Sequence, residues 1–182
     1  HLLEPTVGEV IYVPPGVIHS LGSGLCILEP QEPTDWSILA EWKGFPYGRQ
    51  GGTLGLGWDL ALKAADFSKL EINDLNGYIK RTPITVREEN GSREERLLPD
   101  EATPFFQVSR LTIESQLNMP AEKGFHCLVT LQGQGKLRGP FDDAPIERGK
   151  SVFIPSCLPE YEIVNTGATA MEVVCCYPPV AD

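Results

Sequence analysis

Residues 8–32, with the sequence GEVIYVPPGVIHSLGSGLCILEPQE, are the stretch that decides the fold. Residues 10–13 are β-branched or aromatic, which favours a strand. Residues 14–16, Pro-Pro-Gly, predict a tight turn, because proline fixes φ and glycine accepts positive φ. His19 follows the turn, and residues 25–28 are apolar enough for a second strand. The stretch therefore predicts two strands joined by a turn that carries one histidine.

His19 has two interpretations. Taken alone, it is most simply a hydrogen-bonded turn histidine, whereas a histidine at a strand end inside a small barrel can point into the lumen as a metal ligand. The spacing of Gly8, Pro14, Gly16 and His19 favours the second interpretation. It resembles the second sequence motif of the cupin barrels, in which the histidine is a metal ligand.

The longer run resembles the type I mannose-6-phosphate isomerase family. That family has a Val-Pro-x-Gly-x-x-His-Ala-x-Gly turn, then Gly-x-x-x-Leu-Glu and Gln-x-x-Ser-Asp elements. The counterparts here are residues 13–22, residues 24–29 and residues 31–35. The specific match covers about thirty residues, and beyond it the resemblance is one of architecture.

The resemblance implies a reaction and roles for two residues. It implies metal-dependent isomerisation of mannose 6-phosphate to fructose 6-phosphate through an enediol, with zinc polarising the sugar oxygens. His19 corresponds to the last metal ligand of the family, and Glu29 to a residue proposed as acid or base. Glu29 is equally well explained as a strand-end carboxylate in a polar network. The other three ligands of the family lie upstream of this turn, so we expect this chain to be a carboxy-terminal part whose metal site is incomplete.

One position departs from the family pattern. The family has an arginine four residues after the Asp that corresponds to Asp35, and here that position is Leu39. The nearest arginine downstream is Arg49, in a glycine-rich stretch. A guanidinium beside a developing oxyanion contributes about 10²–10³ in rate by analogy with other oxyanion donors. Leu39 therefore indicates weak isomerase activity or a different sugar.

The remainder of the chain predicts a second β region. The apolar residues from Trp58 to Phe67 have helical spacing, which predicts a short helix. Asn90-Gly91 predicts the turn of a β-hairpin, and the charges that alternate in sign along this hairpin are expected to face water. Short strands at regular spacing are typical of a sandwich or barrel. The predicted strands are residues 84–88, 93–98, 105–114, 127–131, 135–137, 151–154, 160–164 and 170–177.

This second β region contains a weak echo of the first motif. Gly149, Pro155 and Glu160 repeat the spacing of the first turn, with Glu160 in place of the histidine and Cys157 in place of the glycine. His126 lacks the paired histidine of a first cupin motif, so we expect a packed, metal-free barrel. It resembles the non-catalytic carboxy-terminal barrel of the isomerase family.

We therefore predict a mainly β protein of double-stranded β-helix (cupin, jelly-roll) architecture. Residues 1–42 are assigned to the end of a catalytic barrel, residues 43–81 to a loop and short-helix connector, and residues 82–182 to a complete second barrel.

The composition excludes several classes of protein. The 182 residues suffice for one domain or two small ones, and many glycines and prolines are typical of a turn-rich β protein. The net charge of −10 argues against nucleic acid or an anionic membrane as partner. No apolar run reaches the roughly 18 residues that span a bilayer. Five cysteines without CxxC spacing argue against a disulfide scaffold or a thiolate zinc site and favour a reducing cytoplasm.

Three functions agree with the sequence. The first is the sugar-phosphate isomerase. The second is a non-catalytic carbohydrate-binding or regulatory double cupin, favoured by Leu39 in place of the arginine. The third is another metal cupin enzyme, such as an oxygenase, which would contain iron rather than zinc.

Overall fold

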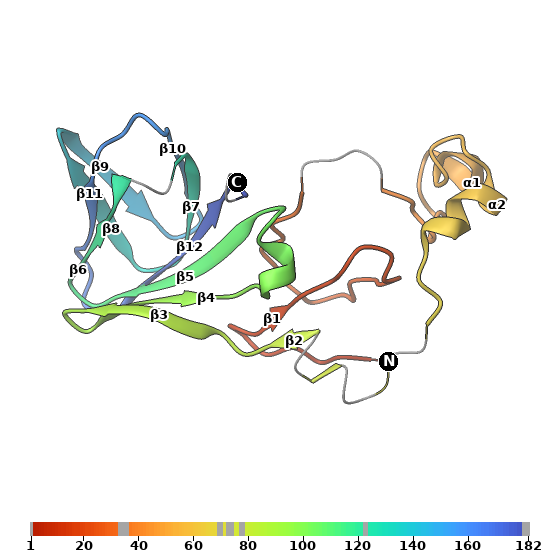
Figure 1. Ribbon diagram of the computed structural model, residues 1–182, viewed down its shortest axis with the longest axis horizontal. Coiled ribbons are helices and arrows are strands. Elements are labelled where there is room, and N and C mark those ends of the chain that lie inside the picture. The colour runs from red at the N-terminus through yellow and green to blue at the C-terminus, as the bar shows by residue number, and fades with distance from the viewer. Residues whose placement is uncertain are drawn as a thin grey trace. The chain divides into compact units, whose positions relative to one another are not determined.

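The computed structural model describes residues 2–32, 37–68, 71, 75–76, 79–121 and 124–179. The chain forms two compact units. The first, which we call the barrel unit, consists of His1–Val10 with Arg81–Asp182, and the second, the amino-terminal unit, is Ile11–Lys80. Strands far outnumber helices, so the prediction of a mainly β protein is confirmed (Figure 1).

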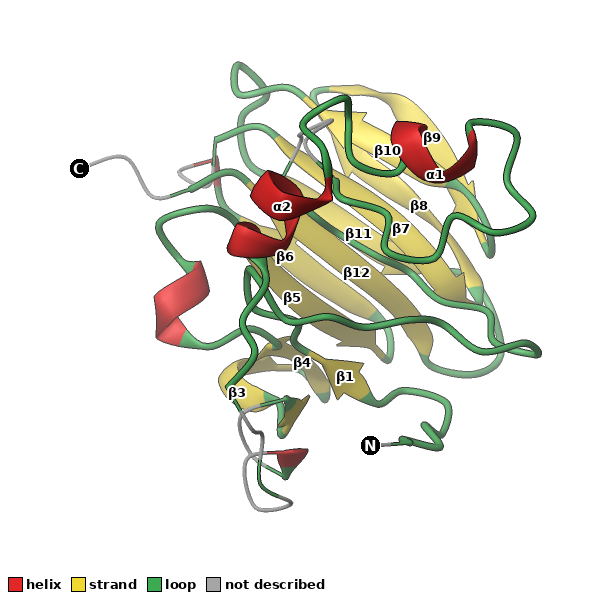
Figure 2. Cartoon of the chain, turned by 90° about the vertical axis from the view of Figure 1, so that its right-hand side faces the viewer, coloured by secondary structure: helices red, strands yellow, loops and turns green. Residues whose placement is uncertain are grey.

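The barrel unit contains ten of the strands of the described structure, arranged in two antiparallel sheets (Figure 2). They are β3 (Ile84–Glu89), β4 (Ser92–Arg96), β5 (Gln107–Ile113), β6 (Gln116–Met119), β7 (His126–Gln132), β8 (Gln134–Gly139), β9 (Phe141–Glu147), β10 (Ser151–Ile154), β11 (Tyr161–Asn165) and β12 (Met171–Tyr177), with a 3₁₀ turn at Asp100–Ala102. One sheet has the order β10-β7-β12-β5-β4-β3, and the other has the order β6-β11-β8-β9.

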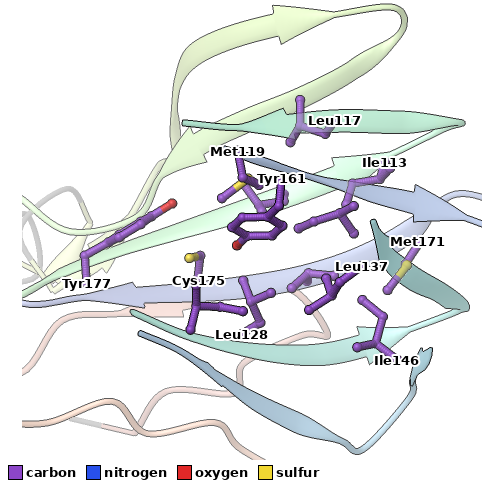
Figure 3. Packing of buried hydrophobic residues seen from close by; sticks show 14 residues of the cluster. Ile113, Leu117, Met119, Leu128, Leu137, Ile146, Tyr161, Met171, Cys175 and Tyr177 are labelled. Atoms are coloured by element: carbon purple, nitrogen blue, oxygen red, sulfur yellow. The ribbon is translucent and has the colours of Figure 1, made fainter. Parts of the chain in front are cut away.

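The hydrophobic core lies between these two sheets. Each of the eight strands β5 to β12 contributes at least one buried side chain, so the two sheets enclose a single apolar interior (Figure 3). The core residues are Leu111, Ile113, Leu117, Met119, Leu128, Leu137, Ile146, Ile154, Tyr161, Ile163, Met171, Val173, Cys175 and Tyr177. A smaller cluster of Leu97, Val108 and Val174 also lies in the barrel unit. Burial of this apolar area is the main stabilising term of the unit.

The period-two pattern predicted the strand faces well. On β5, Leu111 and Ile113 enter the core, whereas Val108 joins the smaller cluster. The Asn90-Gly91 turn is confirmed, since φ is +50° at Asn90 and +80° at Gly91 and the two residues join β3 to β4. Positive φ at both turn residues matches the right-handed twist of a hairpin.

Strands β6 and β9 are present although the sequence did not predict them. Strand β6 has only four residues, two of them polar, and β9 contains Pro145 and two aspartates. Pro145 is tolerated because β9 pairs only with β8 and so forms an edge of its sheet. Both strands are defined by pairing with a neighbour and not by their own propensity.

The prediction that the hairpin charges face water is wrong for two residues. Glu94 and Glu95 of β4 are buried, with 2% and 7% of their surfaces exposed. Glu94 is paired with Arg87 of β3 at 3.2 Å, and Glu95 with Arg110 of β5 at 3.0 Å. The arginines lie on strands that neighbour β4 in the sheet, so only the strand pairing reveals that these carboxylates have partners.

The amino-terminal unit contains little regular structure. Its elements are the helical turns α1 (Gly48–Gly51) and α2 (Trp58–Ala61), with a 3₁₀ turn at Leu62–Ala64, and the short strands β1 (Val10–Ile11) and β2 (Lys80–Arg81) lie at its two ends. The predicted helix from Trp58 therefore ends at Ala64. The predicted strand over residues 25–28 is wrong, because those residues pair with no neighbouring strand in the described structure.

No described helix is long and apolar enough to cross a bilayer.

Replacing Arg87 with methionine should destabilise the barrel unit. The change removes the cation that lies 3.2 Å from the buried Glu94 carboxylate, which costs roughly 3 kcal/mol, the lower end for buried pairs because Arg87 is itself partly exposed. The measurement is the free energy of unfolding in urea. The exposed Arg93→Met is the matched control, expected to cost less than about 1 kcal/mol. Equal losses in both variants would contradict a structural role for the buried pair.

Candidate functional site

The turn before His19 has the conformation that its sequence predicts. Gly16 has φ +85°, and the Val17 N–H donates to the Pro14 carbonyl at 3.3 Å. The Gly16 carbonyl accepts from the Asp66 N–H at 2.8 Å, which ties the turn to a distant segment of the same unit. A Cβ on Gly16 would lie 3.0 Å from the Ala64 carbonyl oxygen, so both the conformation and the space require glycine.

His19 is exposed and its ring is held by its own turn. Nδ1 lies 2.9 Å from the Val17 carbonyl oxygen. Because a carbonyl can only accept, Nδ1 carries the proton in this contact and Nε2 carries the lone pair. Metal-ligating imidazoles are oriented in this way, with the other ring nitrogen donating to a backbone carbonyl. The same contact is expected of a plain turn histidine, so it suits both interpretations of His19.

The other residues of the predicted site are also on the surface of the amino-terminal unit. Glu29 and Leu39 are exposed. Arg49 is in α1, where its guanidinium carbon lies 5.9 Å from the centre of the Trp58 ring, a distance typical of a cation–π contact. Asp35 lies outside the described residues. The described structure thus anchors Arg49 on an aromatic side chain of its own unit.

A complete metal site is not present in the described part of the chain. Within those residues no group of three or more His, Cys, Asp or Glu side chains is arranged to hold a metal ion. The geometry of the turn suits His19 as one metal ligand, with Nε2 as its donor atom.

A second group of chemically active side chains lies inside the barrel unit. We call His126, Tyr161, Cys175 and Tyr177 the interior cluster; all four are buried. His126 Nε2 lies 2.7 Å from the Tyr161 hydroxyl, and Nδ1 lies 3.0 Å from the Gly124 carbonyl oxygen. The His126 ring also packs against the Tyr177 ring, with centroids 5.3 Å apart. Figure 3 shows Tyr161, Cys175 and Tyr177 converging between the strands.

The interior strongly favours the neutral forms of the two tyrosines. Burial raises the pKa of Tyr161 far above its usual value, and the neighbouring Cys175 raises it further. Burial also raises the pKa of Tyr177, with additional contributions from Cys175 and from the negative charge of Glu94. Both hydroxyls therefore remain protonated across the physiological range and act as hydrogen-bonding groups rather than as bases.

The sequence singled out two candidate residues in the second β region, His126 and Glu160. His126 belongs to the interior cluster, and Glu160 does not. Both ring nitrogens of His126 are within hydrogen-bonding distance of protein oxygens, whereas Glu160 is exposed. His126 and Glu160 stand out in the sequence by their place in the motif, whereas Tyr161, Cys175 and Tyr177 belong to no motif of it. The available signal was strand alternation, because Cys175 and Tyr177 fall on the same face as the core residue Val173.

Eight antiparallel strands enclose one apolar core in two facing sheets, which is the arrangement of a jelly-roll barrel. The fold of the chain matches the crystal structure of the mannose 6-phosphate isomerase from Bacillus subtilis with a TM-score of 0.51 and 20% sequence identity. The superposed region covers 67% of this chain and 34% of that one. The prediction of cupin architecture is therefore confirmed.

The sequence comparisons show similarity to one family. Residues 100–174 match the family model described as mannose-6-phosphate isomerase, cupin domain. The chain is also 24% identical over 162 residues to a protein named "Putative mannose-6-phosphate isomerase YvyI" from Bacillus subtilis (strain 168), covering 87% of this chain and 46% of that relative. The resemblance to the mannose-6-phosphate isomerase family is confirmed, and the chain spans about half the length of the curated relative that it matches.

The buried tyrosines predict a loss of stability in alkali. A tyrosine in the unfolded chain titrates near pH 10, whereas Tyr161 and Tyr177 keep their protons in the folded state well above that pH. The unfolded chain therefore binds fewer protons above pH 10, and the free energy of unfolding falls there by up to about 1.4 kcal/mol per pH unit for each tyrosine. Urea unfolding from pH 8 to pH 11 measures this slope.

Tyr161→Phe tests the assignment of the slope. It removes one buried tyrosine, so the fall in the free energy of unfolding above pH 10 should become shallower by up to about 1.4 kcal/mol per pH unit. It also leaves the buried His126 Nε2 without the hydroxyl, which should cost about 1–3 kcal/mol at neutral pH. The control is Tyr47→Phe, because Tyr47 is exposed. An unchanged alkaline slope in Tyr161→Phe would disprove the role of the interior cluster.

Proposed function

We propose that this chain takes part in the metal-dependent isomerisation of mannose 6-phosphate to fructose 6-phosphate, as a component of a mannose-6-phosphate isomerase-type cupin. The observation that carries the proposal is the match of residues 100–174 to the mannose-6-phosphate isomerase cupin domain. The names of the curated relative and of the structurally similar enzyme, both mannose-6-phosphate isomerases, agree with it. The small-molecule partner is accordingly a sugar phosphate. Residues 1–42 would close a catalytic barrel, and residues 82–182 would form the second barrel.

His19 is proposed as one ligand of a zinc ion. The Val17 carbonyl fixes the tautomer with the lone pair on Nε2, and imidazole nitrogen is a common ligand of zinc. A divalent ion in such a site would polarise the sugar oxygens and favour loss of the neighbouring proton. Among the described residues, the turn offers this one imidazole as a ligand.

Glu29 is proposed to move the proton between the two sugar carbons. Its carboxyl is exposed, which leaves it open to a substrate arriving from solvent. A carboxylate can accept the proton from one carbon and return it to the next, as the enediol route requires. Leu39 replaces the expected arginine, and the Arg49 guanidinium lies over the Trp58 ring.

Zinc content tests the role of His19. In the complete polypeptide that contains this chain, His19→Ala should reduce the zinc bound per protein after dialysis, because one of the ligands is lost. The exposed neighbour variant Ser20→Ala is the matched control and should retain its zinc. Elemental analysis of both purified variants gives the answer. Equal zinc content would show that His19 is only a turn residue, and iron in place of zinc would favour an oxygenase.

Turnover tests the role of Glu29. Glu29→Gln should lower kcat for mannose 6-phosphate by about 10²–10⁴, the usual contribution of a general base, with unchanged zinc content. Glu32→Gln, also exposed and three residues further on, is the control and should leave kcat unchanged. A coupled assay for fructose 6-phosphate measures both. Equal activity in the two variants would remove Glu29 from the mechanism.

A non-catalytic carbohydrate-binding or regulatory role is the second candidate. Leu39 in place of the arginine favours it, as does a second barrel whose interior is filled by side chains. On this alternative, mannose 6-phosphate raises the melting temperature of the zinc-loaded protein without being converted. Turnover in the coupled assay would exclude this alternative, and stabilisation without turnover would exclude the isomerase.

A further inference from the structure

Two cysteines lie directly opposite each other at the centre of the six-stranded sheet. Cys127 of β7 is the register partner of Cys176 of β12 in an antiparallel pair. They belong to one row that crosses four adjacent strands, in which Phe153 pairs with Cys127 and Cys176 pairs with Val108. Side chains of opposed residues project from the same face of a sheet, so both thiols lie on one side of it.

This row is on the face of the sheet away from the barrel core. The next residue along β12, Cys175, is in the core, and successive side chains of a strand alternate between faces. Cys127 and Phe153 are exposed, whereas Cys176 is half-buried against the smaller cluster that contains Val108. The Cys127 side chain is therefore exposed to solvent, whereas the Cys176 side chain is partly covered.

The register brings the two thiols close to the geometry of a disulfide. Opposed residues in an antiparallel pair have Cα atoms roughly 4.5–5.5 Å apart, within the usual range for disulfides. Their Cβ atoms are roughly 4.5–5.5 Å apart, whereas a disulfide prefers about 3.8 Å. The bond can thus form if the strands approach slightly, and the resulting strain makes it easy to reduce.

We propose that Cys127 and Cys176 form a dithiol site that exchanges with low-molecular-weight disulfides, such as oxidised glutathione, and becomes a reversible cross-strand disulfide. This site is separate from the proposed isomerase chemistry and uses none of its residues. Both cysteines are free thiols in the structure, as are the other three.

The exchange proceeds in two balanced steps. The Cys127 thiolate attacks one sulfur of oxidised glutathione, forms a mixed disulfide and releases one molecule of reduced glutathione. The Cys176 thiolate then attacks the Cys127 sulfur, forms the cross-strand bond and releases the second. Two protein thiols are oxidised and one glutathione disulfide is reduced. Burial, with a contribution from Cys127, raises the pKa of Cys176 to about 11, so the exposed Cys127 is the first nucleophile and Cys176 resolves the intermediate.

Peptide mapping of the native protein after incubation with oxidised glutathione tests the proposal. After acid quenching, alkylation and trypsin digestion, Cys127 is in the peptide of residues 124–136, and Cys157, Cys175 and Cys176 are in the peptide of residues 151–182. The expected product is a link between these two peptides that excess reduced glutathione removes. When the protein is unfolded in guanidinium, the same treatment should give disulfides between several pairs of cysteines, because the strand register that places Cys127 opposite Cys176 is then lost.

Two variants identify the sulfurs. Cys176→Val keeps an apolar side chain against the smaller cluster and should abolish the link, leaving Cys127 as a stable glutathione adduct. Cys157→Ser changes an exposed cysteine that is not opposite Cys127 and should leave the link intact. The proposal is overturned if the native protein gives only glutathione adducts, if the link persists in Cys176→Val, or if Cys157→Ser removes it.

Discussion

The register of β12 is the constraint on which the rest of the barrel unit depends. This last strand pairs with β5 on one side and with β7 on the other. It therefore joins elements that are far apart in the sequence. Its alternation sends Val173, Cys175 and Tyr177 into the core and leaves Cys176 on the other face. A slip of one residue would exchange these two sets, so burial of the inward residues fixes the pairing of both neighbouring strands.

The same burial determines the chemistry of the barrel interior. Between the sheets, Tyr161 and Tyr177 are held in their neutral forms, and both nitrogens of His126 are within hydrogen-bonding distance of protein oxygens. Groups that would be reactive in water act here as paired polar members of a packed core. Charged side chains follow the same principle at the hairpin, where the buried Glu94 is paired with Arg87. The polar groups of this interior thus belong to its packed core.

The residues proposed for function have the opposite environment. His19 and Glu29 are exposed and lie in stretches without regular structure, whereas both hydrophobic clusters are made from residues of the barrel unit. Catalytic residues are often carried on loops that a rigid scaffold positions. What holds His19 locally is the turn at Gly16 and its contact with Asp66, together with the carbonyl of Val17. The evidence for the barrel is therefore the packing of its buried side chains, whereas the evidence for the candidate site is the sequence motif that contains His19 and Glu29.

The β class, the hairpin at Asn90-Gly91 and the turn that carries His19 could all be predicted from the sequence, because each depends on local backbone preference or a period of two. The burial of Glu94, the strands β6 and β9, and the pairing of His126 with Tyr161 and of Cys127 with Cys176 became visible only in the folded chain. Each of these features needs a partner from a distant part of the chain, and such pairing is fixed by the packing of the whole barrel. No local pattern contains that information.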